Sequence, residues 1–158
     1  MEQTTYNLWS LITYIVSALI ALGMLWRVKE QIKEAVKSNR INRLNSLLTL
    51  EAQIAERRQE LSSAGIALGR FSDKDKSDKT IKEEFNAAEL RFNEATQMYL
   101  NGLDRLCFCV LKGYLDDINM RVEYQTIIAS AVKDYPERFN QDSLYTNIID
   151  VHNKWKRS

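Results

Sequence analysis

The stretch ALIALGMLWRVKEQIKEAVK, Ala18 to Lys37, passes from apolar residues into a row of charges with no proline or turn signal between them. On its apolar side lies a run of nineteen uncharged residues, Leu8 to Trp26. At about 1.5 Å per residue, a helix of this length spans roughly 28 Å, close to the hydrocarbon thickness of a bilayer. Trp9 and Trp26 stand at its two ends, where indole rings favour the headgroup boundary. We therefore expect an N-terminal transmembrane anchor over residues 1–26.

A cleaved signal peptide is the main alternative for this segment. Such peptides begin with a basic region and have a shorter apolar core of roughly 7–15 residues. The residues before Leu8 include Glu2 but no lysine or arginine, although Ala21-Leu22-Gly23 has the small-x-small form of a cleavage site. We expect the segment to be retained as a membrane helix.

Basic residues dominate the sequence that follows the apolar run. Six basic residues, Arg27, Lys29, Lys33, Lys37, Arg40 and Arg43, are opposed only by Glu30 and Glu34. The positive-inside rule then predicts a single-pass protein of the inner (cytoplasmic) membrane, with its N-terminus outside and its C-terminus in the cytoplasm. Cys107 and Cys109 would be reduced thiols there. The residues expected to contact lipid headgroups are Trp9, Trp26, Arg27, Lys29 and Lys33.

The composition predicts an all-α chain, because it has one proline, five glycines and many strong helix formers. Apolar residues at spacings of three and four continue past the membrane segment, so residues 27–71 are expected to form an amphipathic stalk helix. Residues 80–158 are expected to complete a cytoplasmic bundle of about four helices, the first being the extension of the anchor. The intervening loop, Ser72 to Lys79, is charged and has no core-forming residue.

Local signals predict where the bundle helices begin and end. Thr80 and Glu83 match a capping box, and an apolar stripe follows from Phe85 to Val110. Gly113 is expected to end that helix in a left-handed conformation.

Two further helices are expected after Gly113. The third starts at Asp116 or Asp117, has an apolar set that includes Ile118 and Val122, and stops before Pro136. The last starts at Asp142 or Ser143. Its expected apolar set is Leu144, Tyr145, Ile148, Ile149, His152 and Trp155.

The sequence offers few residues for catalysis or metal binding. His152 is the single histidine and lies on the apolar side of a helix end, where packing or capping is its expected role. Cys107 and Cys109 point about 200° apart on a helix, so both cannot bind one zinc ion. Phosphate-binding glycine loops, nucleophile elbows and zinc-protease motifs are missing from the sequence. We expect a protein that is not an enzyme and needs neither metal nor cofactor.

Small residues along the membrane segment favour self-association. Thr13, Ser17 and Ala21 repeat at intervals of four, which lets membrane helices approach closely. Val28 and Ile32 continue an apolar face below the bilayer, so these five residues form the expected interface of a homo-oligomer. Asn39, Asn42 and Asn45 share one face of the stalk and fit either a solvated junction or a polar ring between chains.

The layout resembles small bacterial proteins with one N-terminal membrane helix and a helical cytoplasmic domain of uncharacterised type, some of them encoded in phage-defence loci. The residues that carry the resemblance are YLNGLDRLCFCVLKGYLDD, Tyr99 to Asp117, and the closing YTNIIDVHNKW. The layout is also similar to the membrane accessory protein of type VI CRISPR systems, which implies an oligomeric pore with a degenerate nucleotide-binding helical fold. The ribonuclease motif of that fold is arginine followed by four to six residues and histidine. Arg138 is too far upstream of His152 to fit it, so no catalytic residue is carried over.

Two hypotheses for function follow. The first is a membrane-anchored, self-associating effector or accessory protein that perturbs the inner membrane in antiphage defence. The alternative is a tethered cytoplasmic module that recruits or inhibits a soluble protein partner. Nucleic acid is a weaker candidate partner, because no aromatic residues are interleaved with the basic run.

Overall fold

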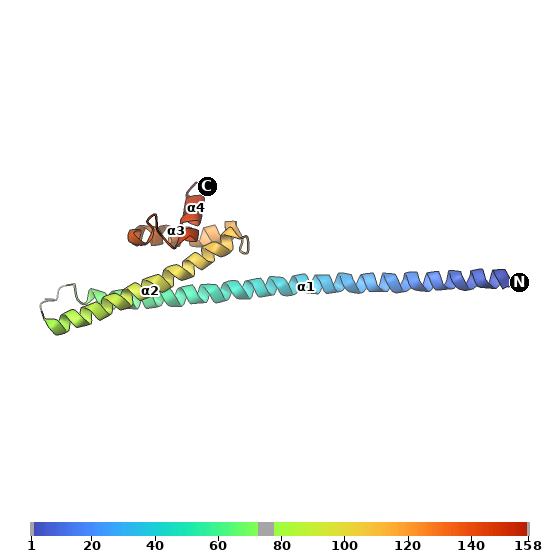
Figure 1. The fold of residues 1–158 in the computed structure, drawn as a ribbon, viewed down its shortest axis with the longest axis horizontal. Coiled ribbons are helices and arrows are strands. Elements are labelled where there is room, and N and C mark those ends of the chain that lie inside the picture. The colour runs from blue at the N-terminus through green and yellow to red at the C-terminus, as the bar shows by residue number, and fades with distance from the viewer. Residues whose placement is uncertain (1, 73–77, 158) are drawn as a thin grey trace. The chain divides into compact units, whose positions relative to one another are not determined.

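The computed structural model describes residues 2–72 and 78–157, and within them the chain is all-α (Figure 1). Its helices are α1 (Glu2–Gly69), α2 (Lys79–Leu111), α3 (Asp117–Asp134) and α4 (Thr146–Arg157), with the short 3₁₀ helix η1 (Pro136–Arg138) before α4. The predicted fold class is confirmed, since a long apolar N-terminal helix is followed by a helical region without strands in the described ranges. The expected loop between α1 and α2 includes residues 73–77, which lie outside the described residues.

The chain divides into two compact units, Met1–Asn45 and Ser46–Ser158. The second unit therefore begins inside the range 27–71 expected as a stalk, and the last part of α1 belongs to the bundle. The first unit is formed by the N-terminal part of α1 alone.

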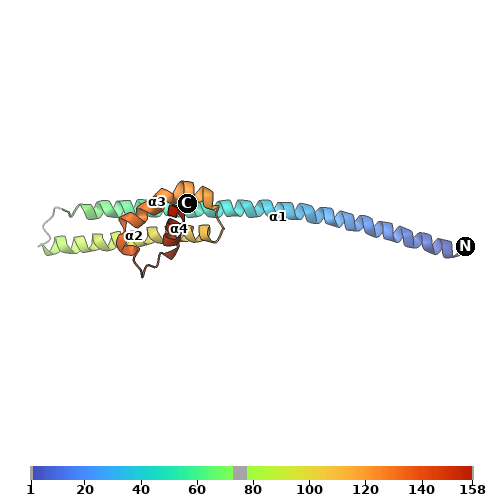
Figure 2. The same ribbon diagram turned by 90° about the horizontal axis from the view of Figure 1, so that it is seen from above.

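Within the second unit, the end of α1 and α2 form an antiparallel hairpin, visible in Figures 1 and 2. Its register follows from close approaches along its length. A Cβ atom on Gly102 would lie 3.3 Å from Cγ1 of Ile54, and one on Gly65 would lie 3.5 Å from the ring of Phe92. Near the loop, the rings of Phe71 and Phe85 pack edge to face with centroids 6.1 Å apart. Gly102 thus permits a close helix contact, whereas a Cβ on Gly65 would meet Phe92 at an ordinary van der Waals distance.

The core of the bundle is built on α2 and closed by α3 and α4. Leu100, Leu103 and Leu106 of α2 are fully buried, as are Ile128 of α3 and Ile148 of α4. The rest of the core cluster is Ile54, Leu61, Tyr99, Cys107, Val110, Met120, Tyr124, Ala131, Tyr145, Val151 and Trp155. Burying these side chains is the main favourable term that holds the short helices α3 and α4 on α2.

The apolar face predicted for the third helix is wrong at its start. Ile118 and Val122 are 75% and 83% exposed, whereas Met120 and Tyr124 are buried. Met120 lies about 200° around the helix from Ile118, and Tyr124 lies about 200° from Val122, so packing Met120 and Tyr124 turns Ile118 and Val122 outward. Tyr124 also donates a hydrogen bond from its hydroxyl to Oε1 of Glu51, 3.3 Å away on α1.

Helix ends match the sequence at some positions and differ at others. The N-cap of α2 is Asp78, whose Oδ1 accepts a hydrogen bond from the Thr80 amide at 2.8 Å, so the predicted Thr80–Glu83 box is wrong. Gly113 has a φ of +69°, which confirms the left-handed end expected there. Asp116 caps α3, and α3 ends before Pro136, as predicted.

The last helix begins later than predicted, at Thr146, and Leu144 is 88% exposed rather than packed in the core. Its N-terminus is bound by a side chain from another helix. Oδ1 of Asp104 on α2 accepts a hydrogen bond from the Ile148 amide at 3.2 Å, and Oδ2 accepts one from the Asn147 side-chain amide at 2.7 Å. Ser143 instead orders the preceding turn, accepting from the Tyr145 amide and donating to the Arg138 carbonyl.

Candidate functional site: the exposed face of α1 and the grooves of the bundle

The membrane-length segment of α1 exposes all of its large apolar side chains. Between Leu8 and Trp26 these side chains are 42–74% exposed. Among the described residues, α1 is the one helix long and apolar enough to cross a membrane, and no part of its most apolar window is buried. Water would hydrate this surface unfavourably, so it requires an apolar environment such as lipid or another helix.

The five residues predicted to form an oligomer interface lie on one side of α1. With about 100° per residue, Thr13, Ser17, Ala21, Val28 and Ile32 fall within an arc of roughly 100°. The Thr13 hydroxyl donates to the Trp9 carbonyl at 2.9 Å, and the Ser10 hydroxyl donates to the Asn7 carbonyl at 2.9 Å. The helix satisfies both hydroxyl donors itself, which leaves a face of small, internally bonded side chains.

Apolar exposure continues past Trp26, where the uncharged segment long enough to span a membrane ends. Val28, Ile32, Val36, Ile41 and Leu44 are 48–60% exposed. Each lies beyond Trp26, in the part of α1 that carries the basic residues.

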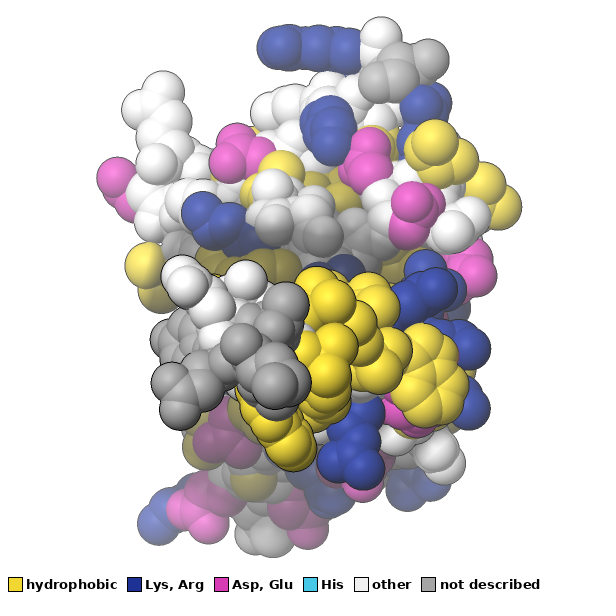
Figure 3. Space-filling model, turned by 90° about the vertical axis from the view of Figure 1, so that its right-hand side faces the viewer, with side chains coloured by type: hydrophobic (Ala, Val, Ile, Leu, Met, Phe, Trp, Pro, Cys, Tyr) yellow, Lys and Arg dark blue, Asp and Glu magenta, His cyan; other side chains and the backbone are white. Residues whose placement is uncertain are grey.

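The residues predicted to contact headgroups are also exposed. Trp9 and Trp26 are each 67% exposed, and Arg27, Lys29 and Lys33 lie open on the helix surface. Figure 3, viewed from the N-terminal end of α1, shows exposed hydrophobic side chains at the front of the molecule. The structure thus presents an apolar surface and adjacent cations on one helix, as an interfacial anchor needs.

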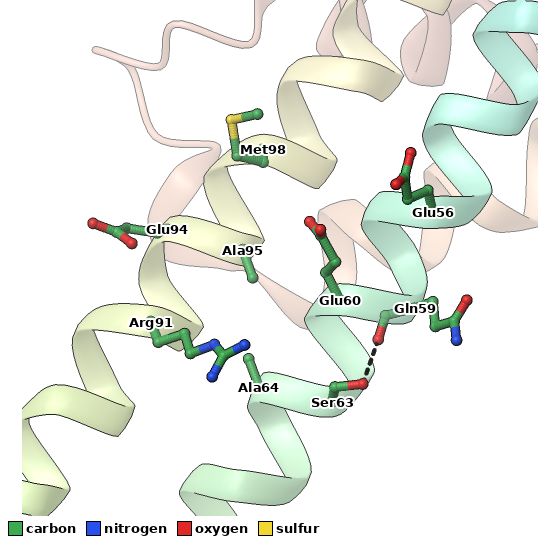
Figure 4. A pocket seen from close by; sticks show the side chains of 9 residues that line it. All are labelled: Glu56, Gln59, Glu60, Ser63, Ala64, Arg91, Glu94, Ala95 and Met98. Carbon is green, nitrogen blue, oxygen red and sulfur yellow. Dashed lines mark hydrogen bonds between the residues drawn. The ribbon is translucent and has the colours of Figure 1, made fainter.

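The bundle has a groove of about 530 Å³ between the end of α1 and α2 (Figure 4). Three carboxylates line it, Glu56 and Glu60 from α1 and Glu94 from α2, together with Arg91 of α2. Ser63 is also in the lining, and its hydroxyl donates to the Gln59 carbonyl at 3.0 Å within the same helix. The groove is open and acidic, and it contains no histidine or cysteine.

A second groove lies between α1 and α3. Two adjoining hollows of about 430 and 230 Å³ share Arg58, Tyr99 and Ile127 in their linings. Burial raises the pKa of Tyr99, and burial together with the carboxylate of Glu51 raises the pKa of Tyr124 to about 12. Both phenols are therefore neutral at physiological pH and act as packing and hydrogen-bonding groups.

The side chains that could act as nucleophiles are kept in unreactive forms. Cys107 is fully buried, and burial raises the pKa of its thiol strongly. Burial also raises the pKa of the Cys109 thiol, so neither is a thiolate near neutral pH. His152 is half-buried on α4. In residues 2–72 and 78–157, no three His, Cys, Asp or Glu side chains come together in a way that could hold a metal ion.

Two polar contacts of the bundle were not foreseen from the sequence. Arg57 donates from Nη1 to the Met98 carbonyl at 3.1 Å, beside Gly102, where a Cβ atom would lie 3.1 Å from that nitrogen. Trp155 is buried and donates from its indole nitrogen to Oδ1 of Asp117 at 3.0 Å. For the first contact, the sequence offered only Arg57 and Gly102, 45 positions apart, and for the second only Asp117 beside the capping residue Asp116. These signals are too weak to predict either contact.

No protein-family model, curated protein or solved structure matches this chain.

Proposed function

We propose that this chain is a membrane-anchored helical effector or accessory protein that self-associates through α1 and perturbs the inner membrane, in the setting of antiphage defence. The observation that carries the proposal is the apolar surface of α1, which is exposed from Leu8 to Trp26 and continues through Val28 and Ile32 to Leu44. A lipid anchor accounts for the first part. Apolar side chains beyond the headgroup boundary favour a protein neighbour.

The basic flank supports the proposed topology, with the N-terminus outside and the bundle in the cytoplasm. Six cations against two carboxylates between Arg27 and Arg43 oppose translocation of this part across the membrane. The antiphage setting rests on the resemblance in layout alone.

A pair of bulky substitutions tests the proposal. Ser17→Leu adds a large side chain to the small-residue face, whereas Gly23→Leu adds one about 120° around the same helix, where nothing lies within 4 Å of the added Cβ. We expect Ser17→Leu to abolish oligomers in blue-native electrophoresis of membrane extracts and to prevent depolarisation of cells that overexpress the protein. Gly23→Leu should leave both unchanged. A wild-type chain that stays monomeric under crosslinking, or depolarisation by both variants, would contradict the proposal.

The tethered binding module is a second candidate, favoured by the surface of the bundle. Ile118 and Val122 of α3 are exposed apolar side chains, and the groove between α1 and α3 lies on the same unit. This candidate predicts that activity survives replacement of residues 8–26 by an unrelated membrane helix and is lost in Val122→Glu. The self-association proposal predicts the opposite pair of results.

A further inference from the structure

From Ala21 onward, one exposed face of α1 follows a repeat of alternating fours and threes. The repeat starts at Ala21 and includes Leu25, Val28, Ile32 and Ala35. It then reaches Asn39 and Asn42 with no change in spacing, and all seven side chains are exposed. A mean spacing of 3.5 residues is that of the core positions of a left-handed coiled coil, in which each helix gives a side chain to every layer.

Charges avoid this row. Eight charged residues lie between positions 27 and 43, and none of them occupies a row position. The positions just before Ile32 and Asn39 are also uncharged, because they are Gln31 and Ser38. The eight are Arg27, Lys29, Glu30, Lys33, Glu34, Lys37, Arg40 and Arg43. In a coiled coil the core layers are dry, whereas flanking positions commonly carry charges such as Lys29 and Arg43, so only a charge within the row would have to be desolvated. A helix that only met water would not need to keep this row free of charge.

A second copy of the chain is the partner that fits this row best. If the chain is a single-pass membrane protein, every copy enters the cytoplasm in the same direction and at the same residue, Trp26. Two neighbouring helices are then parallel, and equal residue numbers lie at equal depth. Ile32 is six residues past Trp26, about 9 Å along the helix, so contact at the membrane helices leads directly into contact along the row.

The short length of the row is not an obstacle at a membrane. A coil of about three heptads is marginal in water, because helix nucleation and association both oppose it. Here α1 is one continuous helix from Glu2 to Gly69, so the row is already helical. Confinement to a bilayer also raises the effective concentration of neighbouring chains.

Asn39 and Asn42 have a role in this arrangement. Asparagine lowers helix propensity, and at a core position of a coiled coil it costs stability. In such a position asparagine specifies the register, because its side-chain amide hydrogen-bonds to the amide of the same residue in the partner only when the two chains are aligned. The apolar layers of Leu25, Val28 and Ile32 would hold the helices together, and the asparagine layers would fix their alignment.

We infer that residues 21–42 form a parallel, in-register coiled coil between copies of this chain, with Ala21, Leu25, Val28, Ile32, Ala35, Asn39 and Asn42 at its core. The inference rests on the proposed function, since it needs the copies to share one membrane and one orientation. It adds a defined contact surface and a defined register to the self-association proposed above.

Disulfide mapping in intact membranes tests the contact surface. The parent is the full chain with Cys109→Ser, since the remaining Cys107 is fully buried. Single cysteines replace Val28, Ile32 or Ala35 in the row, and matched controls replace Glu30 or Lys37, about 200° around from Val28 and Ala35. With copper–phenanthroline as oxidant, we expect at least five times more disulfide dimer from the row positions than from the controls. Equal yields at row and control positions would overturn the inference.

The same experiment separates the inference from the proposed function. Cysteines at Ser17 and Ala21 report contact within the membrane. Crosslinking there, with no excess at Val28, Ile32 or Ala35, would overturn the coiled coil and leave self-association intact. No crosslinking at any of the five positions would overturn both.

A mixed experiment tests the register. A tagged Val28→Cys chain is coexpressed with an untagged Ala35→Cys chain. Because the two positions are seven residues and about 10 Å apart along the helix, a disulfide between them cannot form in register, as bridged Cα atoms lie within about 7 Å. We expect disulfides between like chains only. Mixed dimers as abundant as the like ones would refute the register.

Discussion

Replacing Asp104 with alanine should destabilise the bundle, because this side chain joins α2 to the start of α4. Asp104 lies on α2 but binds the N-terminus of α4, accepting from the Ile148 amide at 3.2 Å and from the Asn147 side chain at 2.7 Å. Both groups are in the first turn of α4, where backbone amides have no partner within the helix. The carboxylate thus caps a helix far away in sequence and places its charge at the positive end of the helix dipole.

The magnitude follows from these contacts. Loss of an N-cap costs about 1 kcal/mol, and a hydrogen bond to a charged group contributes about 1.5–3 kcal/mol, nearer the lower figure where the site is half-exposed. We expect Asp104→Ala to cost about 2–3 kcal/mol, which lowers Tm by roughly 8–12 °C for a unit of this size. Asp104→Asn retains one acceptor oxygen but not the charge, so we expect about half that loss.

The assay can follow the bundle alone. The chain has three tryptophans, Trp9, Trp26 and Trp155. In a background of Trp9→Phe and Trp26→Phe, fluorescence comes from Trp155, which is buried on α4. Thermal unfolding of the full chain in detergent micelles then reports the release of α4. Asp150→Ala, an exposed acidic residue on the same helix, is the matched control and should change stability by less than about 0.5 kcal/mol.

The reasoning would be refuted if Asp104→Ala unfolded within 2 °C of the Asp150→Ala control. In that case, the Ile148 amide and the Asn147 side chain would have other partners of equal quality, and the capping role would be wrong.

Three further predictions concern the contacts of the bundle. Gly102→Leu should lower the free energy of unfolding by about 2 kcal/mol or more, because even a Cβ there would lie 3.1 Å from Nη1 of Arg57 and 3.3 Å from Cγ1 of Ile54. Urea unfolding measures this loss, and an unchanged midpoint would exclude the close approach. Trp155→Phe should cost about 2 kcal/mol through the lost indole hydrogen bond, seen as a lower Tm by circular dichroism, and no loss would contradict that bond. Tyr124 has its pKa raised to about 12 in the folded chain from an ordinary value of 10.0, so its contribution to stability is present below pH 10 and is lost as pH rises to 12. Tyr124→Phe should flatten the fall in stability between pH 10 and 12, and an equally steep fall would refute the shift.

Periodicity predicted the helices well where one apolar stripe dominates. Along α2, Leu103, Leu106 and Val110 follow a single three-to-four spacing, and all three are buried. Along α3 two stripes compete, since Ile118 and Val122 are as apolar as Met120 and Tyr124. Met120 and Tyr124 are the buried pair, because a long methionine and a tyrosine whose hydroxyl reaches Glu51 fill the space over α1 and α2.

Contacts between distant segments could not be predicted from one sequence. The Arg57–Met98 hydrogen bond depends on Gly102, which has no side chain to block the guanidinium. The cap of α4 depends on Asp104, a residue 43 positions away that has no local signature of a cap. Such pairs follow from the register of the α1–α2 hairpin and the placement of α4 on it, and both are set by close packing of many side chains rather than by any short motif.

The apolar surface of α1 separates the two candidate functions more sharply than the bundle does. A tether needs apolar side chains only across the hydrocarbon, where Leu8 to Trp26 already suffice. Val28 and Ile32 lie beyond that segment and are exposed, which a tether does not require, because fully burying each such side chain would contribute about 1.5–3 kcal/mol. The charged residues of the same helix extend that argument, because none of them occupies the row from Ala21 to Asn42, which leaves an uncharged row for a neighbouring helix. Self-association through α1 therefore explains residues that anchorage alone leaves without a role.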